Sequence, residues 1–332
     1  MKAWQLQQLG EPAQAMQLAE LPIPTPGDGQ LLVRVRTVAL NFPDVLLVQG
    51  KYQDRPPLPF TPGIEFCGDV VDGGQDSGFS AGQRVIGGSA LPAGGLAEYA
   101  LANHRELHAA PEGMDDAQAA ALTVAYQTGW MALVHRAALQ PGETVLVHAG
   151  AGGVGSAATA IAKVIGARVV AVVGSAEKVA VARALGADEV VDRSAHPTLE
   201  ELVAALKSAL GPGGADVVFD PVGGDSFLAS TKVIAFEGRL LVIGFAGGTI
   251  PTLQVNHPLV KNYSVLGVLW GAYRCRAPRL IEHAWSALDD MLAGGMPGPF
   301  IWKVLEFDQA ADGLAELAAG RTMGRVVVRA AQ

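Results

Sequence analysis

The chain has 332 residues, of which half are hydrophobic, and its formal net charge is −8. This length predicts about two domains with a large buried core. A negative balance without a basic cluster argues against nucleic acid and membrane surfaces as partners, and the longest apolar runs are far too short to span a bilayer. The first residues lack the apolar core of a signal peptide, and the two cysteines, Cys67 and Cys275, fit a reducing compartment, so a cytoplasmic location is expected.

The first third of the chain is predicted to be mostly β-structure. Residues 30–38 alternate between apolar and polar side chains over part of their length, as a half-buried strand does. Prolines and glycines precede this strand, and three further strands are expected at 64–71, 83–87 and 96–101. Residues 115–134 are rich in Ala, Leu and Gln and predict a helix, with a possible break near Thr128.

A glycine cluster follows the strand predicted at 144–148. Gly150, Gly152 and Gly155 fit the pattern G-x-G-x-x-G and open an Ala-rich helix predicted at 153–165. Glycine permits a tight turn, lets backbone N–H groups approach a pyrophosphate, and lets a helix pack close to a strand. Because a second strand is predicted at 167–173, the pattern indicates a dinucleotide-binding βαβ unit. The alternative is a βαβ unit whose glycines serve packing only.

Strands and helices alternate from the glycine cluster to about residue 269, which predicts a parallel sheet with helices on both faces. The tail does not continue this repeat. A helix is expected at 278–292, strands at 301–305 and 325–329, and a helix between them at 307–320. We therefore expect the tail to complete the N-terminal β domain. The predicted division is a discontinuous domain of residues 1–124 and 268–332, with a nucleotide domain of residues 125–267 inserted into it.

The residues after the second strand of the nucleotide domain predict which dinucleotide binds. Selectivity for NAD normally needs an Asp or Glu at this strand tip to bond the ribose 2′-hydroxyl. Here the tip has Gly174, which leaves room, and Ser175, which can donate a hydrogen bond. Lys178 and Arg193 add cations that suit a 2′-phosphate. The sequence therefore predicts NADPH; the alternative is that both cations are solvated surface charges.

Several motifs together carry a family resemblance. They lie at residues 41–44 (NFPD), 49–52 (QGKY), 62–65 (PGIE), 82–85 (GQRV), 148–155, 220–223 (DPVG) and 320–325 (GRTMGR). In this order and spacing they resemble the zinc-independent quinone oxidoreductases of the medium-chain dehydrogenase/reductase superfamily, the zeta-crystallin-like group. The resemblance implies an α/β fold in which a Rossmann domain, a doubly wound parallel sheet, is inserted into a GroES-like β-rich catalytic domain. It also implies NADPH as cofactor and a homodimer.

The resemblance also assigns cofactor-binding positions. Asp44 is expected either to orient the nicotinamide or to cap the helix after Pro43. Arg193 stands where relatives often have Tyr, and Leu46 stands where some quinone reductases carry a second Tyr. The remaining positions implied for the cofactor are Thr128, Gly152, Gly153, Val154, Val222, Phe245, Val268, Trp270 and Arg325.

No metal site is expected. Zinc-dependent relatives have Cys at the position of Asn41, and the chain lacks a structural lobe with four cysteines. His104 and His108 are four residues apart but without the H-E-x-x-H pattern, and catalytic zinc needs three convergent protein ligands. A metal-free hydride transfer suits an acceptor that is already electrophilic, such as a quinone or an α,β-unsaturated carbonyl.

Tyr52 and Asn41 are the candidate catalytic residues. By resemblance to 2-enoyl thioester reductases, Tyr52 is the expected proton donor; a tyrosine that merely packs at the rim is the alternative. Asn41 offers an amide that can hold a carbonyl or the nicotinamide amide. The expected function is an NADPH-dependent quinone or enone reductase. A 2-enoyl or acrylyl thioester reductase, and an NADPH-binding structural or sensing protein without turnover, remain open. The strand predicted at 265–269 is the expected homodimer edge.

Overall fold

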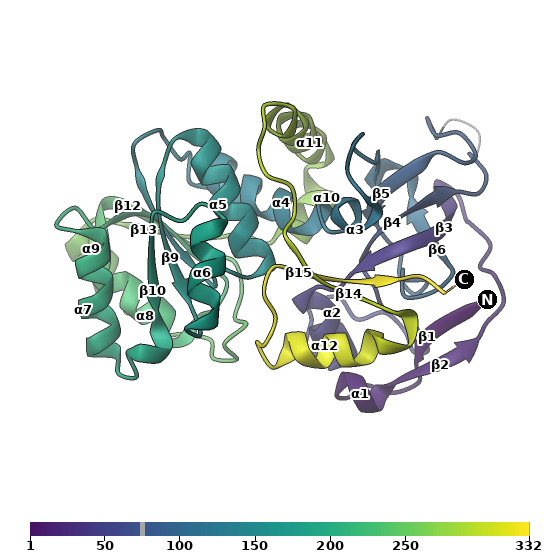
Figure 1. The fold of residues 1–332 in the computed structure, drawn as a ribbon, viewed down its shortest axis with the longest axis horizontal. Helices are drawn as coiled ribbons and strands as arrows, with labels where there is room; N and C mark the ends of the chain where they lie inside the picture. The colour runs from purple at the N-terminus through teal and green to yellow at the C-terminus, as the bar shows by residue number, and fades with distance from the viewer. Residues whose placement is uncertain (74–76, 332) are drawn as a thin grey trace. The chain divides into compact units, whose positions relative to one another are not determined.

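The computed structural model describes residues 1–73 and 77–331. It divides into two compact units (Figure 1). Unit 1 comprises residues 1–123 and 298–332, and unit 2 comprises residues 124–297. The chain thus leaves unit 1 once and returns to it, whereas unit 2 is a continuous segment. Among the described residues, no helix is both long and apolar enough to cross a bilayer.

Unit 2 contains a six-stranded sheet whose neighbouring strands are all parallel. Its strands are β8 (Thr144–His148), β9 (Arg168–Val173), β10 (Glu189–Asp192), β11 (Ala215–Asp220), β12 (Ile234–Val242) and β13 (Ser264–Gly267). Their order is β10-β9-β8-β11-β12-β13. This is the doubly wound order 3-2-1-4-5-6, in which the strand order reverses between the first and fourth strands. Ligands bind such sheets beyond the carboxyl ends of the strands, near that reversal.

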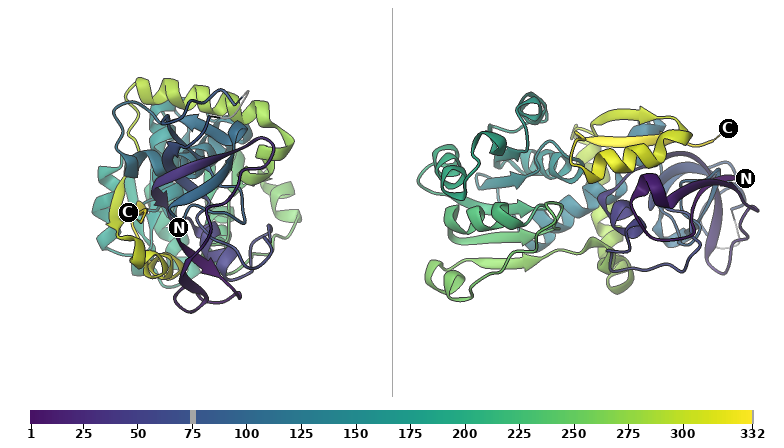
Figure 2. Two further views of the ribbon diagram at one scale, coloured as in Figure 1. Left: turned by 90° about the vertical axis from the view of Figure 1, so that its right-hand side faces the viewer. Right: turned by 90° about the horizontal axis from the view of Figure 1, so that it is seen from below.

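Helices pack along this sheet, as the ribbon in the second view of Figure 2 shows, and apolar side chains of the helices and strands form a shared core. Leu146 and Val170 of the strands form a core with Leu206 and Phe227 of the helices. The helices of this segment are α4 (Thr123–Trp130), a π-helix (Met131–Arg136), α5 (Gly153–Ile165), α6 (Glu177–Ala184), α7 (Leu199–Leu210), α8 (Gly224–Val233), α9 (Asn256–Lys261), α10 (Trp270–Arg276) and α11 (Pro278–Ala293), with a 3-10 turn at Arg193–Ala195.

Unit 1 is built on a seven-stranded sheet of order β14-β15-β3-β4-β5-β7, with β6 also paired to β3. Its strands are β3 (Gln30–Ala39), β4 (Glu65–Val70), β5 (Arg84–Gly88), β6 (Tyr99–Asn103), β7 (Leu107–Ala109), β14 (Ile301–Leu305) and β15 (Arg325–Arg329). A separate antiparallel pair consists of β1 (Lys2–Leu6) and β2 (Met16–Glu20). Since β15 lies between β14 and β3, the tail does complete the N-terminal β structure, and the predicted fold class is confirmed.

The helices of unit 1 are short, and a core around Phe60, Phe66 and Leu314 lies beneath them. They are α1 (Pro12–Ala15), α2 (Phe42–Val48), α3 (Asp116–Ala120) and α12 (Ala310–Ala318), with 3-10 turns at His104–Glu106 and Phe307–Gln309. The single helix expected over residues 115–134 is therefore three segments, α3, α4 and the π-helix. The interruption between α3 and α4 lies at residues 121–122, and the change from α4 to the π-helix after Trp130 lies two residues beyond the predicted break near Thr128.

The second domain boundary also differs from the expected one. Residues 268–297 belong to unit 2 rather than to the β-rich unit. Contacts to α4 explain this assignment. The rings of Trp130 and His283 meet edge to face, with centroids 5.4 Å apart. The Tyr126 hydroxyl donates a hydrogen bond of 2.6 Å to the carbonyl of Pro297. These contacts connect both ends of α11 to the start of unit 2.

Candidate functional site

The loop between β8 and α5 has the geometry that its glycines predict. Gly152 precedes α5, and no side chain caps the helix N-terminus there. A Cβ atom added at Gly150 would lie 2.6 Å from the Cβ of Ala171, and one added at Gly155 would overlap the carbonyl oxygen of Ala149. Both positions thus require glycine for packing. Gly153 and Val154 form the first turn of α5, whose N–H groups and dipole favour an anion.

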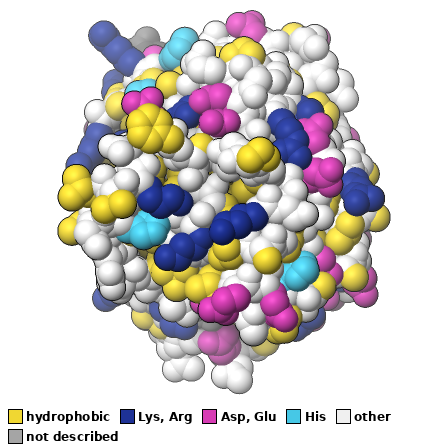
Figure 3. Space-filling view, turned by 90° about the vertical axis from the view of Figure 1, so that its left-hand side faces the viewer, with side chains coloured by type: hydrophobic (Ala, Val, Ile, Leu, Met, Phe, Trp, Pro, Cys, Tyr) yellow, Lys and Arg dark blue, Asp and Glu magenta, His cyan; other side chains and the backbone are white. Residues whose placement is uncertain are grey.

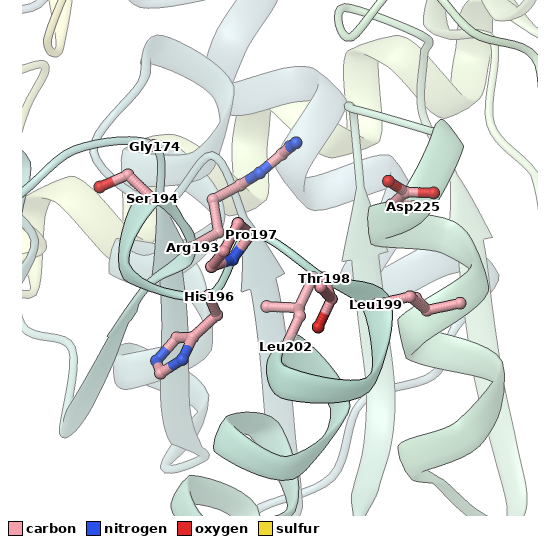
Figure 4. A pocket seen from close by; sticks show the side chains of 9 residues that line it. All are labelled: Gly174, Arg193, Ser194, His196, Pro197, Thr198, Leu199, Leu202 and Asp225. Atoms are coloured by element: carbon pink, nitrogen blue, oxygen red, sulfur yellow. The ribbon is translucent and has the colours of Figure 1, made fainter.

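A cavity of about 360 Å³ opens at the carboxyl ends of β9 and β10, between Gly174 and Arg193 (Figure 4). A Cβ atom added at Gly174 would meet no atom within 4 Å, so this glycine is not required by the packing of the protein. Its small size instead leaves space at a strand tip that carries no carboxylate. The volume is in the range of ligand pockets.

Arg193 is held in this cavity by a hydrogen bond. Its Nη1 donates to the Oγ of Ser226 over 3.3 Å. Ser226 lies in the first turn of α8, and its carbonyl accepts a 2.8 Å hydrogen bond from Ser230. The same Ser230 hydroxyl lies 2.8 Å from Nε2 of the buried His148, and because its own hydrogen goes to Ser226 it accepts this bond from His148. Burial lowers the pKa of His148, which favours the neutral ring.

Ser175 and Lys178 follow Gly174 at the beginning of α6. The backbone N–H of Lys178 donates to the carbonyl of Ser175. Burial lowers the pKa of the Lys178 ammonium group, while Glu177 opposes this shift. In the described chain, neither side chain is among those that line the cavity at Gly174 and Arg193. The two predicted 2′-phosphate contacts therefore remain predictions.

Two loops at the carboxyl ends of β11 and β12 lie side by side. Asp220 begins the DPVG motif, and its Oδ1 accepts hydrogen bonds from the N–H groups of Val222 (2.9 Å) and Gly223 (3.0 Å). The carbonyl of Val222 accepts from Gly247 N–H, close to Phe245. Val222 and Phe245, both predicted cofactor contacts, are thus brought together. An Asp followed by Pro and Gly was the available signal for this turn.

Thr128 and Trp270, the predicted nicotinamide contacts, are connected through a residue that the sequence did not indicate. The Nε1 of Trp270 donates a 2.7 Å hydrogen bond to Oε1 of Gln127, which precedes Thr128. Val268 lies two residues before Trp270 and its N–H donates to the carbonyl of Val242, beyond the end of β13. A tryptophan and a glutamine 143 residues apart give no signal in sequence.

Unit 1 contains a buried charge cluster formed by Asn41, Glu65 and Arg325. Arg325 donates from Nη2 to Oε2 of Glu65 (2.5 Å) and from Nη1 to Oδ1 of Asn41 (2.9 Å). The amide nitrogen of Asn41 donates to the same Glu65 oxygen over 2.9 Å. All three residues are at most 5% exposed. In this cluster the Arg325 guanidinium faces Glu65 and the Asn41 amide faces protein groups, while the predicted roles of Arg325 at a phosphate and of Asn41 at a carbonyl remain predictions.

The Asp44 carboxylate accepts hydrogen bonds from three backbone N–H groups, one at the start of α2 and two in a separate loop. Its Oδ2 accepts from the N–H of Asn41, and its Oδ1 accepts from the N–H groups of Gly63 and Ile64, each over 3.0 Å. Burial raises the pKa of Asp44 to about 7, although these three donors lower it. Of the two roles left open for Asp44, the structure shows capping and loop attachment. Both carboxylate oxygens are engaged in this way.

Asn41, at the position where zinc-dependent relatives have Cys, does not suit a metal ion. The Asn41 oxygen accepts from Arg325, and Glu65 is paired with the same guanidinium. Within residues 1–73 and 77–331, no group of three or more His, Cys, Asp or Glu side chains is placed to hold a metal. Tyr52, the other predicted catalytic residue, is half-buried and packs against the core of unit 1.

The predicted site residues are thus divided between the units. Unit 1 holds Tyr52, Asn41, Asp44 and Arg325, and unit 2 holds all the others. Sequence reasoning missed Gln127, the hydrogen bonds that Asp220 makes within its motif, and the partnership of Glu65 with Arg325. Glu65 was expected to be a structural residue at a Pro-Gly turn, which carries no information about its ionic partner 260 residues away.

Comparisons with known proteins agree with this architecture. A family model described as an alcohol dehydrogenase GroES-like domain matches residues 27–112, and one described as a zinc-binding dehydrogenase matches residues 153–288. The quinone oxidoreductase-like protein 2 of Bos taurus is 41% identical over 302 residues, which are 90% of this chain and 84% of that protein.

Solved structures give the same result. The quinone oxidoreductase of Thermus thermophilus, also solved in complex with NADPH, is 35% identical with a TM-score of 0.82, covering 99% of this chain and all of that chain. The Escherichia coli quinone oxidoreductase complexed with NADPH is 25% identical with a TM-score of 0.88, covering 99% of this chain and all of that chain. These findings confirm the resemblance stated from the motifs. The chain belongs to the quinone oxidoreductase, or zeta-crystallin-like, group of the medium-chain dehydrogenase/reductase superfamily.

Proposed function

We propose that the protein is an NADPH-dependent oxidoreductase that delivers a hydride to a quinone or a related α,β-unsaturated carbonyl. The cavity at the tips of β9 and β10 carries this proposal, since it combines an open Gly174, the cation Arg193 and a strand tip without a carboxylate. Relatives of known structure that bind NADPH support the choice of cofactor. NADPH, when bound, supplies the hydride; the protein positions the reactants.

The residues of unit 2 are suited to hold such a cofactor. The uncapped N-terminus of α5 at Gly152 favours a pyrophosphate. Arg193 offers a guanidinium to a 2′-phosphate, with Ser175 and Lys178 as the further predicted donors. Thr128 and Trp270 are the predicted neighbours of the nicotinamide. The donor set around Asn41 and Glu65 does not suit zinc, so we derive no step that requires a metal.

Tyr52 is the proposed proton donor after hydride transfer. An enone or an enoyl thioester needs a proton at carbon, whereas a quinone acquires protons on oxygen atoms that exchange readily with water. Tyr52 therefore favours a 2-enoyl or acrylyl thioester as the second candidate acceptor. Its half-buried ring packs on the core of unit 1, which would hold the hydroxyl in a fixed position.

The decisive experiment is steady-state oxidation of NADPH with a panel of quinones and a panel of enones and enoyl thioesters. Turnover of quinones would support the first proposal, and turnover restricted to thioesters would support the second. Tyr52→Phe should reduce enone turnover more than quinone turnover, and equal loss would remove Tyr52 from the mechanism. Tight NADPH binding without turnover on either panel would favour a structural or sensing protein.

We further propose a homodimer formed through unit 2. Strand β13 is the edge of the parallel sheet, and an unpaired edge invites a second strand. The segment that precedes it exposes large apolar side chains, namely Ile250, Val255, Leu259 and Val260. Figure 3 shows hydrophobic side chains between Lys and Arg on the end of the molecule where α7 and α9 lie. A second copy paired at β13 would cover such side chains.

The oligomeric state tests this proposal by light scattering coupled to size-exclusion chromatography. The wild-type protein should have the mass of two chains, and Leu259→Glu should shift it toward one. Glu282→Lys, an exposed substitution on α11, is the control and should leave the mass unchanged. A wild-type mass of a single chain would refute the dimer. A cytoplasmic location stays a prediction from the sequence.

A further inference from the structure

The cavity at Gly174 has two chemically different sides. Gly174 and Arg193 follow β9 and β10, whereas Asp225 belongs to the first turn of α8. In Figure 4 the Arg193 side chain extends toward the side of the cavity on which Asp225 lies, and His196 points away from it. Pro197 and Leu202 add apolar surface between these sides. A flat, partly apolar ligand with polar edges would suit this lining.

The position of Asp225 relative to Arg193 indicates how a ligand would be oriented in the cavity. Ser226, the next residue of α8, accepts the hydrogen bond from Arg193 Nη1. The first turn of α8 therefore fixes the guanidinium with one side chain and presents an exposed carboxylate with the adjacent one. A carboxylate repels a 2′-phosphate, so the phosphate should lie toward Gly174, at the strand tip that normally meets the ribose hydroxyl. The base then lies toward Asp225.

We propose that Asp225 is a specificity-determining residue that accepts a hydrogen bond from the exocyclic amino group of the cofactor's adenine. This inference rests on the proposed function, because it takes NADPH as the occupant of the cavity. A carboxylate is an acceptor only, and the amino group of adenine is a donor. Hypoxanthine has a carbonyl oxygen at the same position. The same carboxylate would therefore lose a hydrogen bond and face a second acceptor.

The test compares the dissociation constants of NADPH and its deaminated analogue, nicotinamide hypoxanthine dinucleotide phosphate. Binding is followed by the fluorescence of the reduced nicotinamide, so it does not depend on turnover. Because Asp225 is exposed, we expect a modest preference of about tenfold for NADPH. Asp225→Asn should bring the two dissociation constants to within about twofold, because an amide can also donate to the hypoxanthine oxygen.

A control must separate this role from the general effect of an acidic residue in a helix's first turn. Asp225 also interacts favourably with the N-terminus of α8. Glu200 occupies the first turn of α7 and does not line the cavity. Glu200→Gln removes a carboxylate from an equivalent helix position, and the tenfold preference should persist. Loss of the preference in Glu200→Gln as well would overturn the assignment.

Two further outcomes distinguish this inference from the proposed function. If the wild-type protein binds NADPH but does not prefer it over the deaminated analogue, Asp225 does not contact the amino group and NADPH binding still stands. If the wild-type protein does not bind NADPH, the proposed function itself fails. A third comparison uses NADH. For Asp225→Asn, the preference for NADPH over NADH is measured alongside the preference for NADPH over the deaminated analogue. If only the preference for NADPH over NADH rises strongly, Asp225 lies beside the 2′-phosphate and the inference is overturned.

Discussion

Removal of the cation from the buried ion pair of Arg325 with Glu65 should strongly destabilise the protein, and Arg325→Met tests this. The substitution keeps an apolar side chain of similar length but removes the donors to Glu65 and Asn41. Glu65 is completely buried, so its charge would lose its cation without gaining water. At a separation of 2.5 Å and an effective dielectric constant of about 20, Coulomb's law gives about 7 kcal/mol for the pair. Relaxation reduces this, and removal of one buried partner typically costs about 3–5 kcal/mol.

The measurement is urea unfolding at neutral pH, followed by circular dichroism and tryptophan fluorescence. Arg329→Met is the matched control, because Arg329 lies on the same strand and pairs with Glu306, yet both side chains are at least 60% exposed. The control should lower the free energy of unfolding by less than about 1 kcal/mol. Adding Glu65→Gln to Arg325→Met should restore part of the loss, because the unpaired carboxylate of Glu65 is then removed as well.

Equal effects of Arg325→Met and Arg329→Met would refute this reasoning. So would a double variant no more stable than Arg325→Met alone. The same proteins also test the phosphate role first expected for Arg325. A large loss of NADPH affinity with unchanged stability would restore that role and remove the structural one.

Glu143 and Arg239 form a bidentate pair, with distances of 2.7 and 2.8 Å, that lowers the pKa of Glu143. Because the pKa of Glu143 is lower in the folded than in the unfolded protein, the pair should stabilise the fold above about pH 4.5, and this stabilisation should be lost as pH falls through the folded pKa. In urea unfolding, the free energies of wild type and Glu143→Gln should therefore differ by about 1–3 kcal/mol at pH 7 and converge in acid. Gly174→Ala should leave unfolding unchanged but weaken NADPH binding about tenfold or more in fluorescence titrations, because its Cβ would enter only the cavity. Gly155→Ala should instead lower the unfolding free energy by about 1–3 kcal/mol, since its Cβ would meet the carbonyl of Ala149; an undisturbed Gly155→Ala protein would contradict the packing role.

The features that sequence predicted are those with a local cause. Alternating strands and helices, the turn at Gly150 to Gly155 and the return of the tail all depend on short-range periodicity or on glycine's small size. The helix expected over residues 115–134 has an interruption at residues 121–122 that the sequence did not predict, because its Ala-rich composition does not reveal how its segments pack. Gly129, for example, lies against Ile161, where a Cβ atom would approach to 2.9 Å.

The candidate site was less predictable because its interactions join distant parts of the chain. Asn41 and Arg325 were each singled out, but the hydrogen bond between them spans 284 residues and no local pattern announces it. Asp44 had two ordinary explanations, and only the N–H groups of Gly63 and Ile64 reveal which one applies. Asp225 was not singled out, because an acidic residue in the first turn of a helix already has a common structural reason.

The position of β15 between β14 and β3 has a consequence for how the polypeptide is made. When residues 1–123 have emerged from the ribosome, two of their partners have not yet been synthesised. These are Arg325, which pairs with Glu65, and Phe307, whose carbonyl accepts a hydrogen bond from the indole of Trp4. Unit 2 is contiguous and can complete its sheet first. The sheet of the β-rich unit stays incomplete until the last 35 residues, which contain β14 and β15, have been synthesised. Nascent chains that stop before Gly298 should therefore leave residues 37–39 of β3 without their β15 partner and attract chaperones.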